Sequence, residues 1–244
     1  MTPAVDVTRP VDLSQGRDAK PPGSFLQRLP DEDWHTLLKI GLHGRTFYRD
    51  EVLPMGPETP NIYIIWEGVV RQDRYPLGDA PHIPTITRFR GAGELVGEAA
   101  LVMPGSTVAT RCLTRTVAIP CDARYFTALI ERRLPRARHA LLCSLEQRNR
   151  SDETIYAMAI RPPLERVSRL LAHLATTAGV PDPRDNQQIV ITGPGQKDLA
   201  AALQLAVSTT ENALRTLRHH GVIEARYRQF VIRDIDGLRQ FVGA

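Results

Sequence analysis

The sequence predicts an α+β protein, in which a strand-rich N-terminal half precedes a long helical stretch and a small domain of helices and a hairpin. Between Gly44 and Pro120, short runs of Val, Ile and Tyr are cut by Gly and Pro at intervals typical of a sandwich or barrel. After Arg124 the apolar residues recur at helical spacing instead. With 244 residues, 42% of them hydrophobic, the chain is long enough for one or two domains with cores.

The first elements follow from local composition. Residues 1–24 contain four prolines and little apolar sequence, so we expect a flexible leader. A short helix is expected next, because the acidic run 31–33 favours a helix start and Trp34, Leu37 and Leu38 form an apolar stripe. The following strands are predicted at Ile62–Val70, taken as a pair with a tight turn, at Pro84–Phe89 and at Thr116–Ile119.

The stretch 124–160 is predicted to be helical up to the pair Pro162-Pro163. Proline lacks the N–H that a helix interior needs but suits a first turn, so a new helix and a new domain should begin there. Residues at alternating steps of four and three form a seam suited to the lengthwise pairing of two helices. This predicted dimer seam consists of Leu141, Leu145, Arg148, Asp152, Ile155 and Ala159. The alternative is that the helix packs on its own domain.

The C-terminal region carries the most specific pattern. A short strand at 188–191 is followed by a helix at 197–203 and, after a tight connection, by a second helix that ends at Gly221. Ser208 and Glu211 have the spacing of a capping box at the start of that second helix. Two further strands, 222–225 and 230–232, form a hairpin whose tip is Arg226-Tyr227-Arg228-Gln229.

Two short helices joined tightly and followed by a basic hairpin predict a winged helix-turn-helix. The second helix has a width that fits a major groove. The segment from Gly193 to Arg233 contains six Lys and Arg residues but only three Asp and Glu residues, so it carries a local excess of positive charge. The residues that we expect to contact DNA are Lys197, Val207, Ser208, Thr209, Glu211, Asn212, Arg215, Arg218, Arg226 and Arg228. The alternative is a winged helix that docks on another protein.

Three stretches resemble the cAMP receptor protein superfamily, the Crp–Fnr regulators. Asn61–Val70 looks like a family strand pair, Gly93–Leu101 looks like the phosphate-binding cassette, and Asp198–Ile223 matches the family's helix-turn-helix without a gap. The resemblance implies a cyclic-nucleotide-binding-like β-roll at 25–132, a dimerisation helix at 133–160 and a winged helix-turn-helix at 161–244. It also implies a homodimer that binds near-palindromic promoter DNA and regulates transcription, with RNA polymerase as a further partner.

The effector region departs from the family pattern. The resemblance places the pocket at Gly97, Glu98, Ala99, Ser106, Thr107, Ser151 and Asp152. The arginine that holds the cyclic phosphate in relatives is absent, because Ser106-Thr107-Val108 stands in its place. A carboxylate at Asp152 would repel an anionic ligand unless it were protonated or paired. We therefore expect poor or no binding of cAMP, with no cofactor implied. The alternative is a rearranged pocket that takes a cyclic nucleotide or another small molecule.

The recognition helix departs as well. The ungapped match puts Gln204 at the glycine of the turn, and Val207, Ser208, Glu211 and Asn212 at the base-reading positions. Asparagine pairs with adenine through two hydrogen bonds, so the DNA target should differ from the usual family half-site. If the capping box at Ser208 started the helix later, Ser208 would be a cap and not a reader.

Several classes of function are not supported by the residues. The three cysteines sit in no metal-ligand or disulfide pattern, so no metal site is expected. No catalytic motif is found, and we expect no enzymatic activity. No apolar run is long enough to cross a bilayer and no secretory signal is seen, so the expected location is the cytoplasm, without a membrane partner. The net charge of +4 fits an anionic partner, although biased amino-acid usage explains it equally well.

Overall fold

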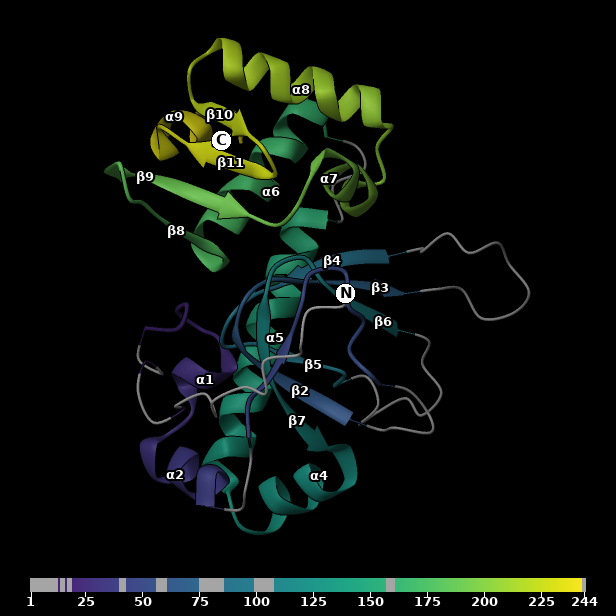
Figure 1. The fold of residues 1–244 in the computed structure, drawn as a ribbon, viewed down its shortest axis with the longest axis vertical. Helices are drawn as coiled ribbons and strands as arrows, with labels where there is room; N and C mark the ends of the chain where they lie inside the picture. The colour runs from purple at the N-terminus through teal and green to yellow at the C-terminus, as the bar shows by residue number, and fades with distance from the viewer. Residues whose placement is uncertain are drawn as a thin grey trace, which may run out of the picture.

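The computed structural model describes residues 13, 16, 19–39, 43–55, 61–74, 86–98, 108–156 and 161–242. Figure 1 shows two bodies, a lower one that holds the sheets β1–β7 and an upper one that holds α6–α9 and β8–β11. Helix α5 (Pro135–Tyr156) runs along the lower body toward the upper one. The observed fold is the α+β fold that the sequence predicts.

Two antiparallel sheets form the lower body, which we call the roll. The first sheet has the order β1-β7-β2-β5 and the second the order β4-β3-β6. The strands are β1 (Arg45–Phe47), β2 (Asn61–Glu67), β3 (Val70–Arg74), β4 (Ile86–Arg90), β5 (Leu95–Val96), β6 (Val108–Cys112) and β7 (Thr116–Asp122).

The expected strand pair at Ile62–Val70 is wrong, because β2 and β3 belong to different sheets. Gly68 causes the change of direction. Its φ of +98° lies in the left-handed region, and a Cβ there would come within 2.6 Å of the Arg115 carbonyl oxygen. The chain therefore crosses from one sheet to the other at this glycine, and β2 pairs with β7 instead.

Helices cover one side of the first sheet, with bounds α1 (Phe25–Arg28), α2 (Asp31–Lys39) and α4 (Ala123–Arg132). The short helix predicted to start with the acidic run 31–33 is confirmed as α2, and its Trp34 stacks on Trp66 with 5.6 Å between ring centroids. Two described residues of the predicted leader contact the rest of the fold. Leu13 is buried, and Lys20 donates to the Trp66 carbonyl oxygen at 2.7 Å.

The described residues 123–156 form two helices separated by a short turn. Helix α4 ends at Arg132, and α5 begins at Pro135 after a short turn. The break has a simple cause, since proline cannot donate a helical hydrogen bond and is best placed in a first turn. The same rule operates at Pro163, which is the first residue of α6 (Pro163–Thr177). Residues 157–160, which include the seam residue Ala159, lie outside the described residues.

The upper body has one four-stranded sheet of order β10-β11-β9-β8. Its remaining elements are β8 (Gly179–Asp182), β9 (Asp185–Thr192), α7 (Gln196–Leu203), α8 (Val207–His219), β10 (Ile223–Arg226), β11 (Gln229–Ile232) and α9 (Ile235–Gln240). Buried leucines of α6, α7 and α8 form its core. The same cluster continues into the roll through Val69, Phe89 and Leu113, so the two bodies share apolar packing.

Candidate nucleic-acid interface

Helices α7 and α8 form a compact pair joined by a three-residue turn. The turn depends on Gln204, which adopts φ +53° and ψ +45°, a left-handed conformation that normally favours glycine. Gln204 stands where the resembling family has a glycine, and its backbone has the left-handed conformation that favours glycine. Gln204 holds this geometry at a conformational cost, and the amide of Leu205 closes the turn on the Ala200 carbonyl oxygen at 2.9 Å.

The start of α8 differs from the capping box suggested by the sequence. The helix begins at Val207, its N-cap is Ala206, and no side chain caps it. Ser208 is therefore inside the first turn, where its hydroxyl is exposed, rather than at the cap. The uncapped first turn leaves backbone N–H groups available to an anion, which is the arrangement that helix starts offer to phosphate.

The two faces of α8 are separated as predicted. Thr210, Ala213, Leu214 and Leu217 are buried against the rest of the domain. On the opposite face Val207 is 44% exposed, and Ser208, Asn212, Arg215 and Arg218 are exposed, while Thr209 and Glu211 are half-buried. Arg215 donates to Asn212 at 3.2 Å and to Glu211 at 3.3 Å. Figure 1 places this helix on the outside of the upper body, away from the roll.

The hairpin β10–β11 ends in a two-residue tip, Tyr227-Arg228. Arg228 has φ +55°, and its guanidinium lies 5.4 Å from the centre of the Tyr227 ring. Tyr227 is 86% exposed and is not among the residues that we expect to contact DNA. Its place between two arginines at a hairpin tip was the available signal, because such an aromatic ring has no core to fill.

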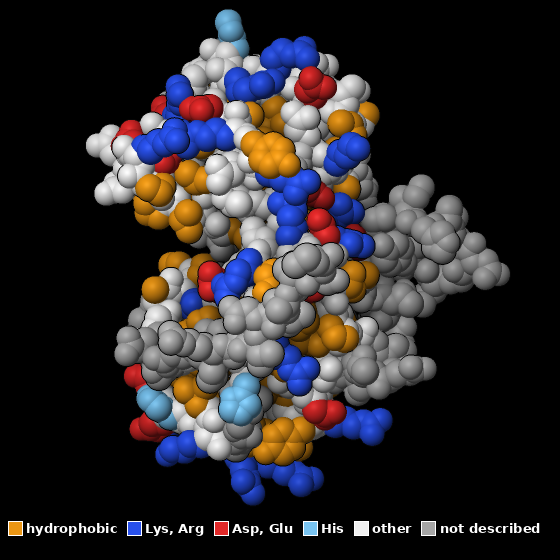
Figure 2. Space-filling model, viewed as in Figure 1, with side chains coloured by type: hydrophobic (Ala, Val, Ile, Leu, Met, Phe, Trp, Pro, Cys, Tyr) orange, Lys and Arg blue, Asp and Glu red, His pale blue; other side chains and the backbone are white. Residues whose placement is uncertain are grey.

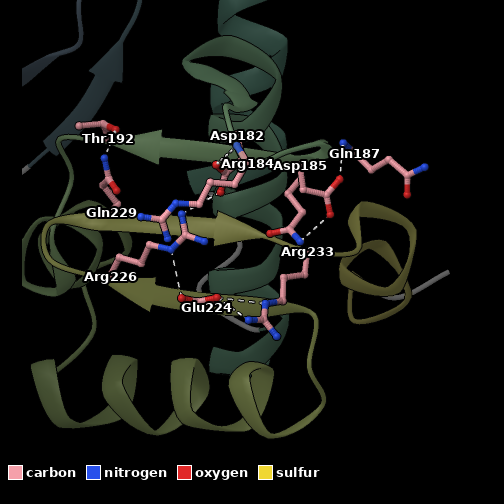
Figure 3. Close-up of polar contacts among 10 residues, drawn as sticks. Asp182, Arg184, Asp185, Gln187, Thr192, Glu224, Arg226, Gln229 and Arg233 are labelled. Carbon is pink, nitrogen blue, oxygen red and sulfur yellow. Dashed lines mark hydrogen bonds and ion pairs between the residues drawn. The ribbon is translucent and has the colours of Figure 1, made fainter.

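Arg226 is engaged within the domain, although we expected it to lie near phosphate. Figure 3 shows it between Asp182 of β8 and Glu224 of its own strand, with distances of 2.7 Å and 3.1 Å. Arg233 holds the other oxygen of Glu224. The pKa of the Asp182 carboxyl is lowered most by the hydrogen bond from the backbone N–H of Arg184 and then by Arg226. The pKa of the Glu224 carboxyl is lowered by its hydrogen bonds from Arg226 and Arg233. Arg226 thus ties the hairpin to β8.

The charged surface is mixed. Over the upper body in Figure 2, basic and acidic side chains alternate, so this face has no uninterrupted basic area. Lys197 at the start of α7 is exposed, as are Arg218 and Arg228. Of the cations that we expect to contact DNA, these three are thus exposed at the start of α7, at the end of α8 and at the hairpin tip.

The expected effector residues are only partly brought together. Ala99, Ser106 and Thr107 lie outside the described residues. Gly97 has φ +88°, and a Cβ there would come within 2.7 Å of the Asn61 carbonyl oxygen, so the glycine is required by close packing. Glu98 is held by the guanidinium of Arg148 from α5, which also donates to the Leu95 carbonyl oxygen at 2.9 Å.

Asp152 is also held by arginine. Arg90 of β4, whose side chain is 6% exposed, donates to its two oxygens at 3.1 Å and 2.6 Å, and Arg88 lies 3.6 Å away. The carboxylate is thus paired, which was the condition under which it would not repel an anion. Arg90 and Arg88 nevertheless already pair with Asp152.

A small cavity adjoins this pair. It has a volume of about 60 Å³, room for a few water molecules, and lies where the roll, α5 and α6 meet. Ser151 lines it together with Arg90, Glu94, Ser144, His173 and Thr177. Burial raises the pKa of the Glu94 carboxyl. Burial, followed by the charge of Arg90, lowers the pKa of His173 to about 4. The cavity is therefore lined largely by polar and titratable side chains.

The predicted dimer seam faces the chain's own core. Leu141 and Ile155 are buried, Leu145 packs against the cluster of the roll, and Arg148 and Asp152 make the ion pairs just described. Within one chain these five residues thus contact the roll, and a dimer contact through them stays a prediction. Periodicity identifies residues that share a face, but here the strands of the roll supply the partner for that face.

Two negative findings concern the described residues alone. No group of three or more His, Cys, Asp or Glu in that part of the chain is placed to hold a metal ion. Within the same residues, no helix combines the length and the apolar character needed to cross a membrane.

Comparison with known proteins agrees with this arrangement. The family model of the Crp-like helix-turn-helix domain matches residues 165–241. Similar solved structures include a CRP-family transcriptional regulator of Thermus thermophilus (TTHB099; 23% identity, TM-score 0.63) and FixK2 of Bradyrhizobium japonicum (18% identity, TM-score 0.64). Each match covers 82% of this chain and 97% of the other chain. No curated protein matches the chain in sequence.

These findings define a class. A Crp-like helix-turn-helix domain follows a β-roll and a long helix, in the order found in Crp–Fnr regulators. The chain has the fold of the Crp–Fnr superfamily of transcription regulators and carries the helix-turn-helix domain of that superfamily.

Proposed function

We propose that the chain is a homodimeric, sequence-specific DNA-binding transcription regulator that is not controlled by cAMP. The observation that carries this proposal is the exposed outer face of α8 within a Crp-like helix-turn-helix domain. Asn212 and Val207 would contact base edges in the major groove, while Lys197, Arg218 and Arg228 would contact phosphates on either side. The uncapped start of α8 would accept a further phosphate.

Dimerisation is proposed through the outer face of α5. His139, Leu142, Glu146, Asn149 and Glu153 recur at steps of three and four and are all exposed. Leu142 is 49% exposed, and Asn149 follows it by one heptad. A leucine and an asparagine at the same heptad position suit a two-stranded parallel pair, in which the asparagine fixes the register. Two recognition helices would then lie about 34 Å apart, one turn of DNA.

Independence from cAMP is proposed from the charges near the effector region. Arg148 is neutralised by Glu98 and Arg90 by Asp152, so a cyclic phosphate would have to displace a carboxylate before either arginine could bind it. Calorimetry with cAMP and cGMP tests this point. We expect no binding at micromolar concentrations, and micromolar binding would instead support a regulator with a rearranged cyclic-nucleotide pocket.

DNA binding itself is tested by fluorescence anisotropy on random duplexes at several salt concentrations. Phosphate contacts make log K fall linearly with log salt. The proposal expects a slope that corresponds to several phosphate contacts for each dimer. Absence of binding at low salt would favour the alternative, a winged helix that docks on protein.

A further inference from the structure

A chain of polar contacts crosses from the roll to the start of the helix-turn-helix. Thr87 donates to Asp73 at 2.6 Å, and Arg71 donates to the same Asp73 oxygen at 2.9 Å. The guanidinium of Arg71 then donates to Asp198 of α7 at 2.8 Å. Through its other oxygen, Asp198 accepts the backbone N–H of Gly195, the residue that precedes α7, at 2.8 Å.

The residues at the roll end of this series of contacts are buried on paired strands. Thr87 is 2% exposed and Asp73 is 7% exposed, and they lie on the paired strands β4 and β3. The side chains of Arg71 and Asp198 are 19% and 21% exposed. An ion pair that is partly withdrawn from water is screened less than a surface pair, so it constrains the two bodies more strongly.

Close backbone packing surrounds the ion pair. A Cβ on Gly91, at the end of β4, would lie 2.6 Å from the Thr177 carbonyl oxygen at the end of α6. A Cβ on Gly193 would lie 3.2 Å from the Cβ of Leu113. The helix-turn-helix domain thus meets the roll near the end of α6, before α7 and at the start of α7. Contacts at three separate points fix an orientation, whereas one contact would leave a hinge.

The orientation leaves the recognition helix usable. Ser208 and Asn212 are exposed while Asp198 is engaged, and Figure 1 shows α8 on the side of the domain that faces away from the roll. Arg71 is therefore placed to act on DNA binding without blocking or touching the reading face.

We infer that Arg71 is a positioning residue for DNA recognition, carried by the effector domain. Its ion pair with Asp198 sets the angle of α7 and hence the separation of the two recognition helices in the dimer. This inference rests on the proposed dimeric, DNA-binding function. In such a dimer, loss of the tether would leave each half-site contact intact but would relax the spacing at which two half-sites are read together.

The experiment compares Arg71→Ala, Asp198→Asn and the double variant with Arg115→Ala. The last removes another arginine of the roll, which forms a surface pair with Glu67. Binding is measured to duplexes with one half-site, and to duplexes with two half-sites at the preferred spacing or shifted by two base pairs. We expect each interface variant to reduce the preference for the correct spacing roughly tenfold, with single half-site affinity within about twofold of the parent. The double variant should be no worse than either single variant.

Hydrogen exchange on the DNA-free dimer gives a second readout. The amides of Asp198 and Leu199, which donate to the Gly195 carbonyl oxygen, should exchange about tenfold faster in Arg71→Ala but not in Arg115→Ala. Unchanged spacing preference together with unchanged exchange would overturn the inference, as would an equal loss on single half-sites. If the parent protein bound no duplex, the proposed function would fail, while faster exchange would still establish Arg71 as the residue that positions α7.

Discussion

Asp152 of α5 accepts two hydrogen bonds from Arg90 of β4, at 3.1 Å and 2.6 Å, in the region where the roll, the long helix and α6 meet. This pair joins a strand of the roll to the helix that leads to the helix-turn-helix domain. The negative charge of Asp152 is therefore balanced within the protein.

Removal of this carboxylate should be costly. In Asp152→Ala the Arg90 guanidinium keeps its burial but loses its main counter-charge, so we expect a loss of about 2–3 kcal/mol in the free energy of unfolding. Glu67→Ala is the matched control, because its pair with Arg115 is exposed and should contribute less than about 0.5 kcal/mol. Urea denaturation measures both, and equal effects would contradict the account.

His173 makes stability fall in acid. Its pKa is lowered to about 4 in the folded protein, while the unfolded chain binds a proton near the ordinary value of 6.5. Above pH 6.5 both states are neutral and the residue has no effect. As the pH falls from 6.5 to 4 the unfolded state gains a proton first, which costs up to about 3 kcal/mol of stability.

His173→Gln should therefore flatten the profile of unfolding free energy between pH 6.5 and pH 4. Exposed His35 supplies the control, since His35→Gln should leave the profile unchanged. An acid loss of the same size in His173→Gln would show that other groups cause it.

The turn between α7 and α8 should be improved by glycine. Gln204 occupies a left-handed conformation that costs a residue with a Cβ about 1–2 kcal/mol. Part of the gain is offset by the greater entropy of glycine in the unfolded chain, so Gln204→Gly should stabilise by about 0.5–1 kcal/mol in thermal unfolding. Gln204→Ala retains the Cβ and should not stabilise. Stabilisation by alanine alone would place the cause in the side chain.

The outer face of α5 can be tested against the inner one. Leu142→Glu should dissociate the dimer without unfolding the protomer, because Leu142 is 49% exposed within one chain. Leu145→Glu should instead destabilise the fold, since Leu145 packs against the core of the roll. Sedimentation and circular dichroism separate the two results. Val180→Glu, at a residue that is 56% exposed on β8, is the neutral control.

Asn212 and Arg218 should affect DNA binding in different ways. Asn212→Ala should relax the preference at one base pair by about 1–3 kcal/mol. Arg218→Ala should weaken binding to all sequences at least tenfold and reduce the salt slope by about 2, because each of the two protomers loses one phosphate contact. Arg124→Ala, an exposed arginine of α4, should change neither. The assignment of roles would be reversed if Arg218→Ala altered base preference and Asn212→Ala did not.

Local sequence patterns predicted several features of the C-terminal domain correctly. The inward face of α8 and the stop at Gly221, whose φ is +71°, follow from spacing and residue type, whereas the place of the turn at Gln204 came from the resemblance to the family. The capping box failed although its residues are present. In the fold, Thr210 donates both its backbone N–H and its hydroxyl to the Ala206 carbonyl oxygen, so the helix starts before Ser208.

Contacts between segments that are distant in the sequence could not be predicted from local patterns. Arg71 and Asp198 are 127 residues apart, and neither residue type signals a partner. The seam of α5 was correctly identified as one face, but nothing local says whether a second copy or the roll covers it. The N-terminal segment had the composition of a free leader, yet Lys20 and Leu13 find partners on the roll that only the fold supplies.

Selection of bound sequences from a pool of random duplexes tests the central claim most directly. The account predicts enrichment of two related half-sites in two-fold symmetry, with centres about 10 base pairs apart, as two recognition helices about 34 Å apart require. Recovery of no sequence above the starting pool, from a protein that sediments as a single chain, would contradict it.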